Sequence, residues 1–420
     1  MFIKMKNILL YILFFQLTAK AQQNTHVNNG VSKMRINSGS LAIKINYYFQ
    51  SGIVNDDGHY NAFPQFTDEE GNVVYGVYEK TSSHAADGNI TLVKTQDKGR
   101  TWQSSFIVVA GDTAVGANFC FIRVSSRLII CYRKSSGIYM AWSDNGGSTW
   151  TASASHIDDS TGRPVYPCPV KMIKSPQGKI LFSYYVPTDV TFPAKGILME
   201  SADTGKTWAN KSTIFSHNTF ALSAPISDWR GNEVGFNYTE EAGTDAGSKM
   251  IAIVRVALSN DGGTYPMFFK SNNGGSTWYQ DTLIYNSPSG FTDDNGAVQN
   301  GNFSECLLYN FLNGNNPFDI KRMGDSVYVV AGERNGTYGY ALKVISAKYD
   351  SAFSSHFTNW TRPRFIKYYH ALIAGASTDC GYPCFFQAEG HLFVADYDVS
   401  TQTPNSFADR RCLVEIVKIK

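Results

Sequence analysis

Long apolar runs are almost absent from this chain of 420 residues. The run from Ile8 to Phe15 is too short to span a bilayer comfortably, and no later segment is long enough. Charge of one sign is scarce as well, because 37 Lys and Arg residues face 35 Asp and Glu residues, giving a formal net charge of +2. Because positive and negative charges are nearly equal in number, we do not expect nucleic acid or a membrane surface as a partner.

Cysteine and histidine residues with the spacing of a zinc site are also missing, and we expect neither a metal nor a cofactor. The seven cysteines are Cys120, Cys131, Cys168, Cys306, Cys380, Cys384 and Cys412. An odd number leaves at least one thiol unpaired even where disulfides are permitted. The sequence leaves both readings open, disulfides in an exported chain or buried free thiols.

The N-terminus has the pattern of an export signal. Lys4 and Lys6 precede the apolar run, and Ala19-Lys20-Ala21 follows it. We therefore expect a signal peptide over residues 1–21, cleaved after Ala21, and a periplasmic or secreted product. The residue directly after that position is Gln22 rather than a cysteine, so a lipid anchor is not indicated. Residues 22–39 are polar and are expected to form a flexible leader.

One short pattern occurs four times and reads Ser/Thr-x-Asp/Asn-x-Gly-x-Thr-Trp. In it Asp or Asn folds back on its own backbone, Gly accepts positive φ, and Trp buries its ring beside the turn. We call these segments the repeat turns; their third and last residues are Asp97 and Trp102, Asn145 and Trp150, Asp203 and Trp208, and Asn273 and Trp278. Each turn is flanked by strand-like residues and predicts a β-hairpin.

The spacing of the repeat turns predicts the fold. Successive Trp residues lie about 50 to 70 positions apart, enough for one four-stranded sheet per repeat. Residues 40–420 are therefore expected to form one all-β domain, a six-bladed β-propeller of four-stranded antiparallel sheets. The strand expected over Leu41–Phe49 would complete the last sheet beside the C-terminal run Cys412–Ile419.

The repeat turn resembles the Asp box of the sialidase superfamily. The resemblance implies that these turns lie on the outer hairpins of the blades and have a structural role. It also implies a site built from other residues: three arginines that hold a substrate carboxylate, a Tyr nucleophile assisted by a Glu, and an Asp as acid/base. A phenol suits such a substrate because an anionic sugar repels a carboxylate nucleophile.

On this resemblance the nucleophile would be Tyr382, within Asp379-Cys380-Gly381-Tyr382-Pro383. We expect Pro383 to hold Tyr382 in an extended conformation. The assisting carboxylate would be Glu240, whose spacing fits slightly better than that of its neighbour Glu241. Arg255, at the end of an apolar strand, would be one anchor for the substrate.

Further candidates follow from the same resemblance. Arg334, which follows an apolar strand, would be another anchor, and Asp379 is a substrate-binding candidate. The acid/base would be Asp87, with His84 as the alternative. Ala62 stands where the first arginine of the family is expected, so the carboxylate clamp would have only two arginines or would borrow another cation such as Lys80 or Arg133.

The sequence thus predicts an exported, exo-acting glycoside hydrolase of sialidase type that releases a terminal acidic sugar from glycans. An alternative is a polysaccharide lyase or other glycosidase acting on uronic acids, in which Tyr382 and His84 share the proton transfers. A second alternative is a propeller that binds glycans without catalysis. Ala62 puts the identity of the sugar in doubt more than the class of reaction.

Overall fold

The computed structural model describes residues 48–82, 87–106, 114–115, 119–135, 137–168, 170–187, 194–216, 229–258, 264–280, 291–292, 298–299, 318–333, 341–354, 360–361, 364–368, 381–399 and 412–419. Contacts between residues divide the chain into two units, Met1–Tyr48 and Phe49–Lys420. Apart from Tyr48, every described residue belongs to the second unit. No helix among the described residues is long and apolar enough to cross a membrane.

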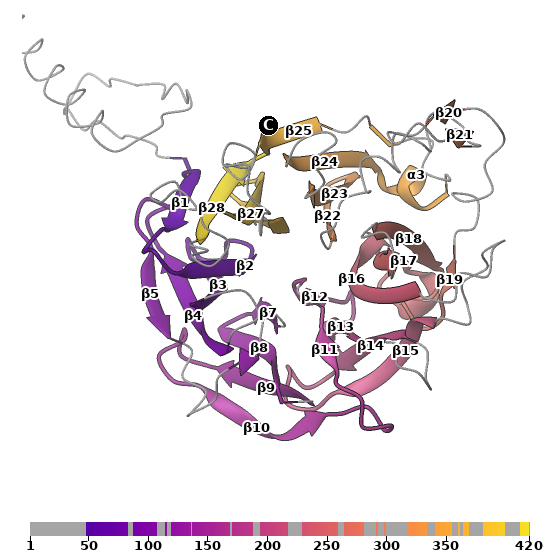
Figure 1. The fold of residues 1–420 in the computed structure, drawn as a ribbon, viewed down its shortest axis with the longest axis horizontal. Helices are drawn as coiled ribbons and strands as arrows, with labels where there is room; N and C mark the ends of the chain where they lie inside the picture. Colours follow the sequence, from indigo (N-terminus) through magenta and orange to yellow (C-terminus); the bar gives the residue numbers. More distant parts are fainter. Residues whose placement is uncertain are drawn as a thin grey trace, which may run out of the picture. The chain divides into compact units, whose positions relative to one another are not determined.

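The second unit is a six-bladed β-propeller, as the sequence predicts (Figure 1). Blade 1 contains β2 (Tyr60–Phe66), β3 (Val74–Thr81), β4 (Asp87–Thr95) and β5 (Gln103–Phe106). Blade 2 contains β7 (Phe119–Val124), β8 (Arg127–Lys134), β9 (Gly137–Ser143) and β10 (Thr151–Ile157). Blade 3 contains β11 (Tyr166–Pro167), β12 (Ile173–Lys174), β13 (Ile180–Val186), β14 (Lys195–Ser201) and β15 (Ala209–Ser216).

The second half of the ring continues the pattern. Blade 4 contains β16 (Trp229–Glu240), β17 (Lys249–Leu258), β18 (Thr264–Ser271) and β19 (Tyr279–Gln280), and blade 5 contains β22 (Phe318–Met323), β23 (Ser326–Glu333), β24 (Ala341–Lys348) and β25 (Arg364–Tyr368). Blade 6 contains β26 (Gly381–Ala388), β27 (His391–Val399), β28 (Cys412–Lys418) and β1 (Gly52–Asn55). Among the described residues, three short strands lie outside the blades: β6 (Ala114–Val115), which pairs with β4, and the ribbon of β20 (Phe291–Thr292) and β21 (Val298–Gln299).

The two ends of the propeller close the ring. Strand β1 pairs antiparallel with β28, and a parallel bridge joins Tyr60 to Cys412, so blades 6 and 1 share one sheet. Figure 1 shows β1 beside β28. The C-terminal run is the partner that the sequence predicts. The closing strand is Gly52–Asn55, whereas residues 41–47 of the expected strand lie outside the described residues.

Most of the apolar core lies between neighbouring blades rather than at one centre. Separate clusters fill the contacts of blades 2 and 3, of blades 3 and 4, of blades 4 and 5, and of blades 6 and 1. Each sheet therefore buries both faces, which explains why strands such as Ile180–Val186 are apolar almost throughout. Four of the seven cysteines, Cys120, Cys131, Cys168 and Cys384, are buried free thiols; the thiols of the other three lie outside the described residues.

The innermost strand of a blade has one edge with no strand beside it, and side chains from neighbouring blades cap that edge. The amide of Gln65 donates to the carbonyl of Phe119 (2.6 Å) and accepts from the amide of Phe121 (2.9 Å). In blade 4, the carbonyl of Val234 accepts from the hydroxyl of Ser183 (3.0 Å). These bonds satisfy buried backbone groups and fix each inner strand to the next blade.

Each repeat turn is held by a side chain at its third position. In the turn of blade 4, the amide N–H of Thr277 donates to Asn273 Oδ1 (2.9 Å), and the Ser271 hydroxyl accepts from the amide of Gly275 (2.8 Å). The indole N–H of Trp278 donates to the carbonyl of Gly275 (3.1 Å). The same bonds recur in the turns of blades 2 and 3, so the repeated sequence encodes a repeated geometry.

Asp and Asn are interchangeable at the third position because only the direction of one hydrogen bond changes. Asp203 Oδ2 accepts from the hydroxyl of Thr207 (2.6 Å), whereas the amide of Asn145 donates to the hydroxyl of Thr149 (2.8 Å). The threonine hydroxyl serves as donor in one case and as acceptor in the other.

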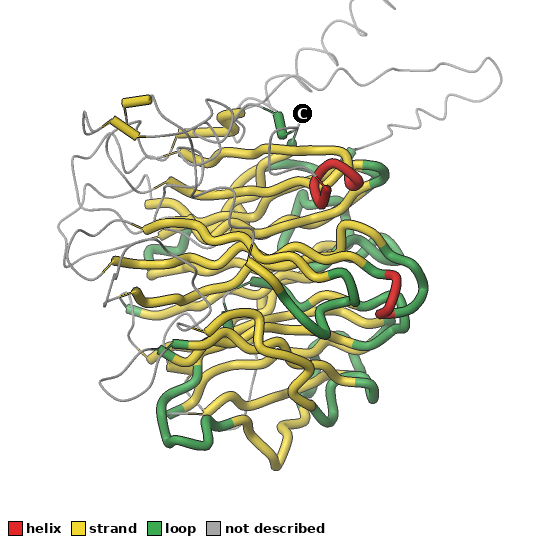
Figure 2. The backbone as a smooth tube through the Cα atoms, turned by 90° about the vertical axis from the view of Figure 1, so that its right-hand side faces the viewer, coloured by secondary structure: helices red, strands yellow, loops and turns green. Residues whose placement is uncertain are grey.

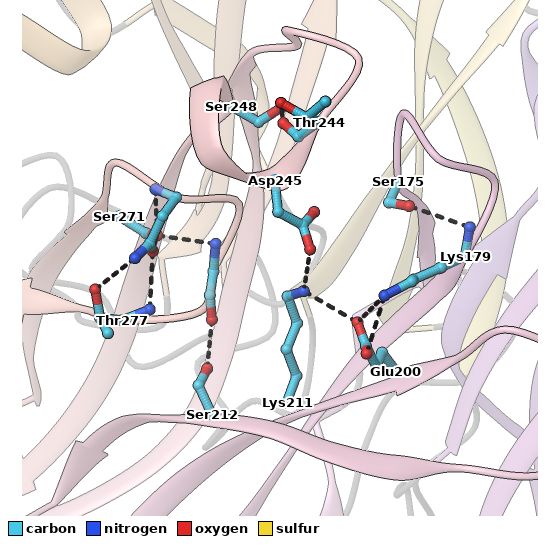
Figure 3. Close-up of polar contacts among 12 residues, drawn as sticks. Ser175, Lys179, Glu200, Lys211, Ser212, Thr244, Asp245, Ser248, Ser271 and Thr277 are labelled. Atoms are coloured by element: carbon cyan, nitrogen blue, oxygen red, sulfur yellow. Dashed lines mark hydrogen bonds and ion pairs between the residues drawn. The ribbon is translucent and has the colours of Figure 1, made fainter.

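The repeat turns also join one blade to the next, as Figure 3 shows for blades 3 and 4. Ser212 in β15 donates to the carbonyl of Gly275 (2.5 Å). Beside it, Lys211 bridges Glu200 (3.0 Å) and Asp245 (2.7 Å). The repeat turns thus link neighbouring blades at the outer edge of the ring.

The propeller has two distinct ends. Because the strands of each blade alternate in direction, the turn between its third and fourth strands lies at the end where the inner strand finishes. The 3-10 helix η2 (Asp245–Gly247) and helix α3 (Tyr349–Ser354) lie at that end too, on the right in Figure 2. Helix α3 takes the place of a repeat turn in blade 5. The inner strands begin at the opposite end.

Candidate active site

Three inner strands are irregular at the end where they begin. The pairing register shifts between Ala62 and Gln65 in β2, between Gly231 and Val234 in β16, and between Gly381 and Cys384 in β26. Such bulges re-aim side chains and are frequent beside active sites. The candidate site lies at this level.

Tyr382 occupies the bulge of β26 with a left-handed backbone. Its φ is +59°, after Gly381 at +99°. Our expectation that Pro383 keeps Tyr382 extended is therefore wrong, because the bulge imposes a conformation that costs a non-glycine residue about 1 to 2 kcal/mol. Phe63, also followed by proline, has the same conformation in β2 (φ +57°). Strained residues of this kind gather at functional sites.

Glu233 and Arg255 form an ion pair on the first two strands of blade 4. One guanidinium nitrogen of Arg255 lies 3.1 and 3.0 Å from the two carboxylate oxygens of Glu233. Only 8% of the Glu233 side chain and 16% of the Arg255 side chain are exposed. Glu233 sits in the bulge of β16, which turns its carboxylate towards the arginine.

The Tyr382 hydroxyl completes a three-residue cluster. It lies 3.3 Å from Glu233 Oε1 and 3.3 Å from the same nitrogen of Arg255. These separations exceed those of fully formed bonds, as is common in catalytic groups that tighten around substrate. The cluster combines a phenol, a carboxylate and a guanidinium, and such groups are chemically able to act as nucleophile, proton acceptor and cation in covalent catalysis on a sugar.

Aromatic side chains fix the ring of Tyr382. Phe63 meets it edge to face at 4.6 Å, and Tyr397 lies at 6.2 Å. Tyr60 and Tyr132 belong to the same buried cluster. Packing on this scale leaves the phenol ring little freedom, so its hydroxyl is held at Glu233.

Charged side chains from three other blades hold the free edge of β26. The backbone amide of Phe385 donates to Asp319 Oδ2 (2.6 Å), and the backbone carbonyl of Phe385 accepts from Lys171. The amide of Gln387 donates to Asp68 Oδ1 (2.8 Å). Burial raises the pKa of Asp319, although Lys171 opposes that shift. This network fixes the strand three residues from Tyr382.

Of the candidates from sequence, Tyr382 and Arg255 come together and Glu240 does not. Glu240 pairs with Lys249 (2.6 Å) at the far end of β16, and both side chains are more than one third exposed. Its neighbour Glu241 is exposed. The carboxylate beside Tyr382 is Glu233. The register of the hairpin formed by β16 and β17 identifies this residue. Tyr238 pairs with Met250, and the same register along the two strands places residue 233 opposite Arg255.

The other candidates are either paired elsewhere or undescribed. Lys80 forms an ion pair with Asp57, whose carboxylate also accepts from Asn61 (2.9 Å). Asp87 begins β4, and its side chain lies outside the described residues. The candidates that lie outside the described residues altogether are His84, Arg334 and Asp379. Ala62 is fully buried in β2. In the described part of the chain, no group of three or more His, Cys, Asp or Glu residues could hold a metal ion.

No family model matches the sequence, and no curated protein matches it either. Solved structures do resemble the fold. A protein of unknown function from Dyadobacter fermentans is 16% identical, with a TM-score of 0.60 over 88% of this chain and 97% of that one. The NanB sialidase of Streptococcus pneumoniae is 11% identical, with a TM-score of 0.55 over 90% and 71%.

A third similar structure is an alpha-L-arabinofuranosidase of Fusarium graminearum, solved with arabinobiose. It is 11% identical, with a TM-score of 0.54 over 88% of this chain and 96% of that one. At these identities the likeness concerns the fold, which this chain shares with glycoside hydrolases of different specificity.

Proposed function

We propose that the protein is a glycoside hydrolase in which Tyr382 is the nucleophile and Glu233 accepts its proton. The observation that carries the proposal is the contact of the Tyr382 hydroxyl with both Glu233 and Arg255. A phenol is a weak nucleophile until a base removes its proton, and a buried carboxylate at contact distance is such a base. Arg255 holds Glu233 in place through its contacts with both carboxylate oxygens.

The reaction proceeds in two steps with retention of configuration. The Tyr382 oxygen bonds to the anomeric carbon as its proton passes to Glu233, while the bond to the leaving oxygen breaks and that oxygen takes a proton from an acid. Asp87 is proposed as this acid, with His84 as the alternative. Water, deprotonated by the same acid/base residue, then attacks the anomeric carbon. The bond from that carbon to Tyr382 breaks, and the tyrosine oxygen takes its proton back from Glu233 as the sugar leaves.

A sialidase-type, exo-acting enzyme that releases a terminal acidic sugar is the specific form that we propose. The grouping of Tyr, Glu and Arg supports it, as do the four repeat turns that resemble Asp boxes and the fold shared with NanB. A tyrosine nucleophile suits an anionic substrate because it is neutral until it reacts. Arg334 and Asp379 are proposed as further contacts of that sugar.

A neutral terminal sugar is the second candidate. Ala62 supplies no cation where the family has its first arginine, and Glu233 already neutralises Arg255. A propeller of the same fold was solved with arabinobiose. A site with one neutralised arginine would favour a sugar without a carboxylate.

The test is turnover of a fluorogenic α-sialoside, followed by mass spectrometry on a panel of acidic and neutral glycans. Release of free sialic acid would support the specific form, and release of arabinose would support the neutral alternative. In either case Tyr382→Phe should lose nearly all turnover and still fold. An unsaturated product would indicate a lyase instead, and binding without any product would indicate a glycan-binding propeller.

A further inference from the structure

Arg133, in β8 of blade 2, is an arginine without an acidic partner among the described residues. Its guanidinium lies over the ring of Tyr166, 4.0 Å from the ring centre. Its Nε is buried and meets no hydrogen-bond acceptor in the described part of the chain. Other arginines of the propeller, such as Arg127 and Arg163, are paired with aspartates. A partly buried guanidinium that keeps unused donors is suited to an anion.

Arg133 contacts one tyrosine ring, which is itself stacked on a second. The ring of Tyr166 stacks on that of Tyr185 with centres 5.0 Å apart and planes 13° apart. We call Arg133, Tyr166 and Tyr185 the arginine stack. The central carbon of the guanidinium lies over the ring of Tyr166. A guanidinium that contacts a ring through its face keeps its edge available for two parallel hydrogen bonds. That edge matches a carboxylate or a sulfate.

The arginine stack lies at the level of the candidate active site. The triplet Tyr166-Pro167-Cys168 repeats Tyr382-Pro383-Cys384, and each triplet stands where the inner strand of its blade begins. Tyr185 packs against the cluster that contains Val234 and Val254, the chain neighbours of Glu233 and Arg255. Burial raises the pKa of Tyr185 well above its usual value, and the charges of Glu233 and Tyr382 add to that effect.

We propose that the arginine stack is a subsite for an anionic substituent, a carboxylate or a sulfate, on the sugar unit next to the one released. This inference rests on the proposed function. It explains why Arg133 meets no acidic side chain in the described part of the chain: the substrate supplies the acid. The anion would be held by blades 2 and 3, whereas Tyr382 belongs to blade 6, so the subsite is compatible with either an acidic or a neutral terminal sugar.

The test is retention of oligosaccharides on immobilised protein, with Tyr382→Phe as the background so that nothing is consumed. The probes are partial digests of pectin, chondroitin sulfate and arabinan, analysed by mass spectrometry. We expect anionic oligosaccharides to be retained about 10- to 100-fold better than neutral ones of equal length, and Arg133→Gln to abolish that preference. Arg133→Lys keeps the positive charge but loses the planar guanidinium that donates two parallel hydrogen bonds, so this variant should retain part of the preference for anionic oligosaccharides.

Arg322→Gln is the matched control, because Arg322 also stacks on a tyrosine, Tyr349 at 4.8 Å, but at the other end of the propeller. This control should leave the preference unchanged. Equal preference in Arg133→Gln, or no preference in the background protein, would overturn the subsite. Turnover by the wild type is measured separately. Anion binding through Arg133 without turnover would refute the proposed function alone, and turnover without anion preference would refute the subsite alone.

Discussion

Two glutamates on the same strand make the assignment of Glu233 testable. Glu233 and Arg255 are almost entirely buried, and removing one partner of a buried pair costs about 3 to 5 kcal/mol. Since Arg255 keeps some contact with solvent, we expect Glu233→Ala to lower the free energy of unfolding by about 3 kcal/mol. Glu240 and Lys249 are more than one third exposed, so Glu240→Ala should cost less than about 1 kcal/mol.

The same pair of residues separates stability from activity. Glu233→Gln keeps the shape of the side chain and a hydrogen-bond acceptor for Arg255, but it removes the base. We expect the rate constant to fall about 10²- to 10⁴-fold. Glu240→Gln should leave both the rate and the unfolding curve unchanged.

The assays are urea unfolding followed by tryptophan fluorescence and initial rates on the substrate that the glycan panel identifies. Because the two variants share one chemistry and one strand, general effects of the substitution cancel. A loss of rate in Glu240→Gln with normal rates in Glu233→Gln would refute our reasoning. Equal losses in both would mean that the rate reports stability rather than proton transfer.

Further predictions concern the turns and the inner strands. Asp203→Ala should destabilise by about 2 kcal/mol in thermal unfolding because Asp203 accepts several hydrogen bonds, whereas Asn145→Asp should change stability by less than about 0.5 kcal/mol. Although burial opposes the shift, hydrogen bonds from Thr207 lower the pKa of Asp203 to about 2, compared with about 3.9 for a free aspartate. The ionised carboxylate therefore contributes fully to the free energy of unfolding above about pH 4, and this contribution is lost as the pH falls towards 2. An acid titration in which Asp203→Asn loses stability as steeply as the wild type would contradict this. Gln65→Ala should cost about 2 to 4 kcal/mol and speed amide hydrogen exchange at Phe121, whose partner it removes; unchanged exchange would show that water replaces the side chain.

The fold was within reach of the sequence because its strongest signal is local. A repeat turn needs only eight consecutive residues, because its side chains form hydrogen bonds with backbone groups of the same turn. Four copies therefore predict four hairpins, and the spacing between the copies predicts the blades. Blades 5 and 6 carry no such signal, since helix α3 replaces the turn in one and the N-terminal strand β1 completes the other.

The candidate site could be predicted only in part from the sequence, because its residues come together through the pairing of strands that are far apart in the chain. Tyr382 and Arg255 stood out as a tyrosine beside proline and an arginine in an apolar strand. The partner carboxylate was misassigned to Glu240, since the bulge that aims Glu233 depends on the register of β16 and β17. The left-handed backbone of Tyr382 is likewise imposed by the sheet against the local preference of a residue before proline.

The central claim is that Tyr382 forms a covalent bond to the sugar. The most direct measurement is mass spectrometry of the protein after incubation with a panel of fluorinated glycosyl fluorides, acidic and neutral, which slow the release of the glycosyl group. We expect one glycosyl group per chain, located on the peptide that contains Tyr382 and absent from Tyr382→Phe. A glycosyl group on another residue, or equal labelling of Tyr382→Phe, would contradict the account.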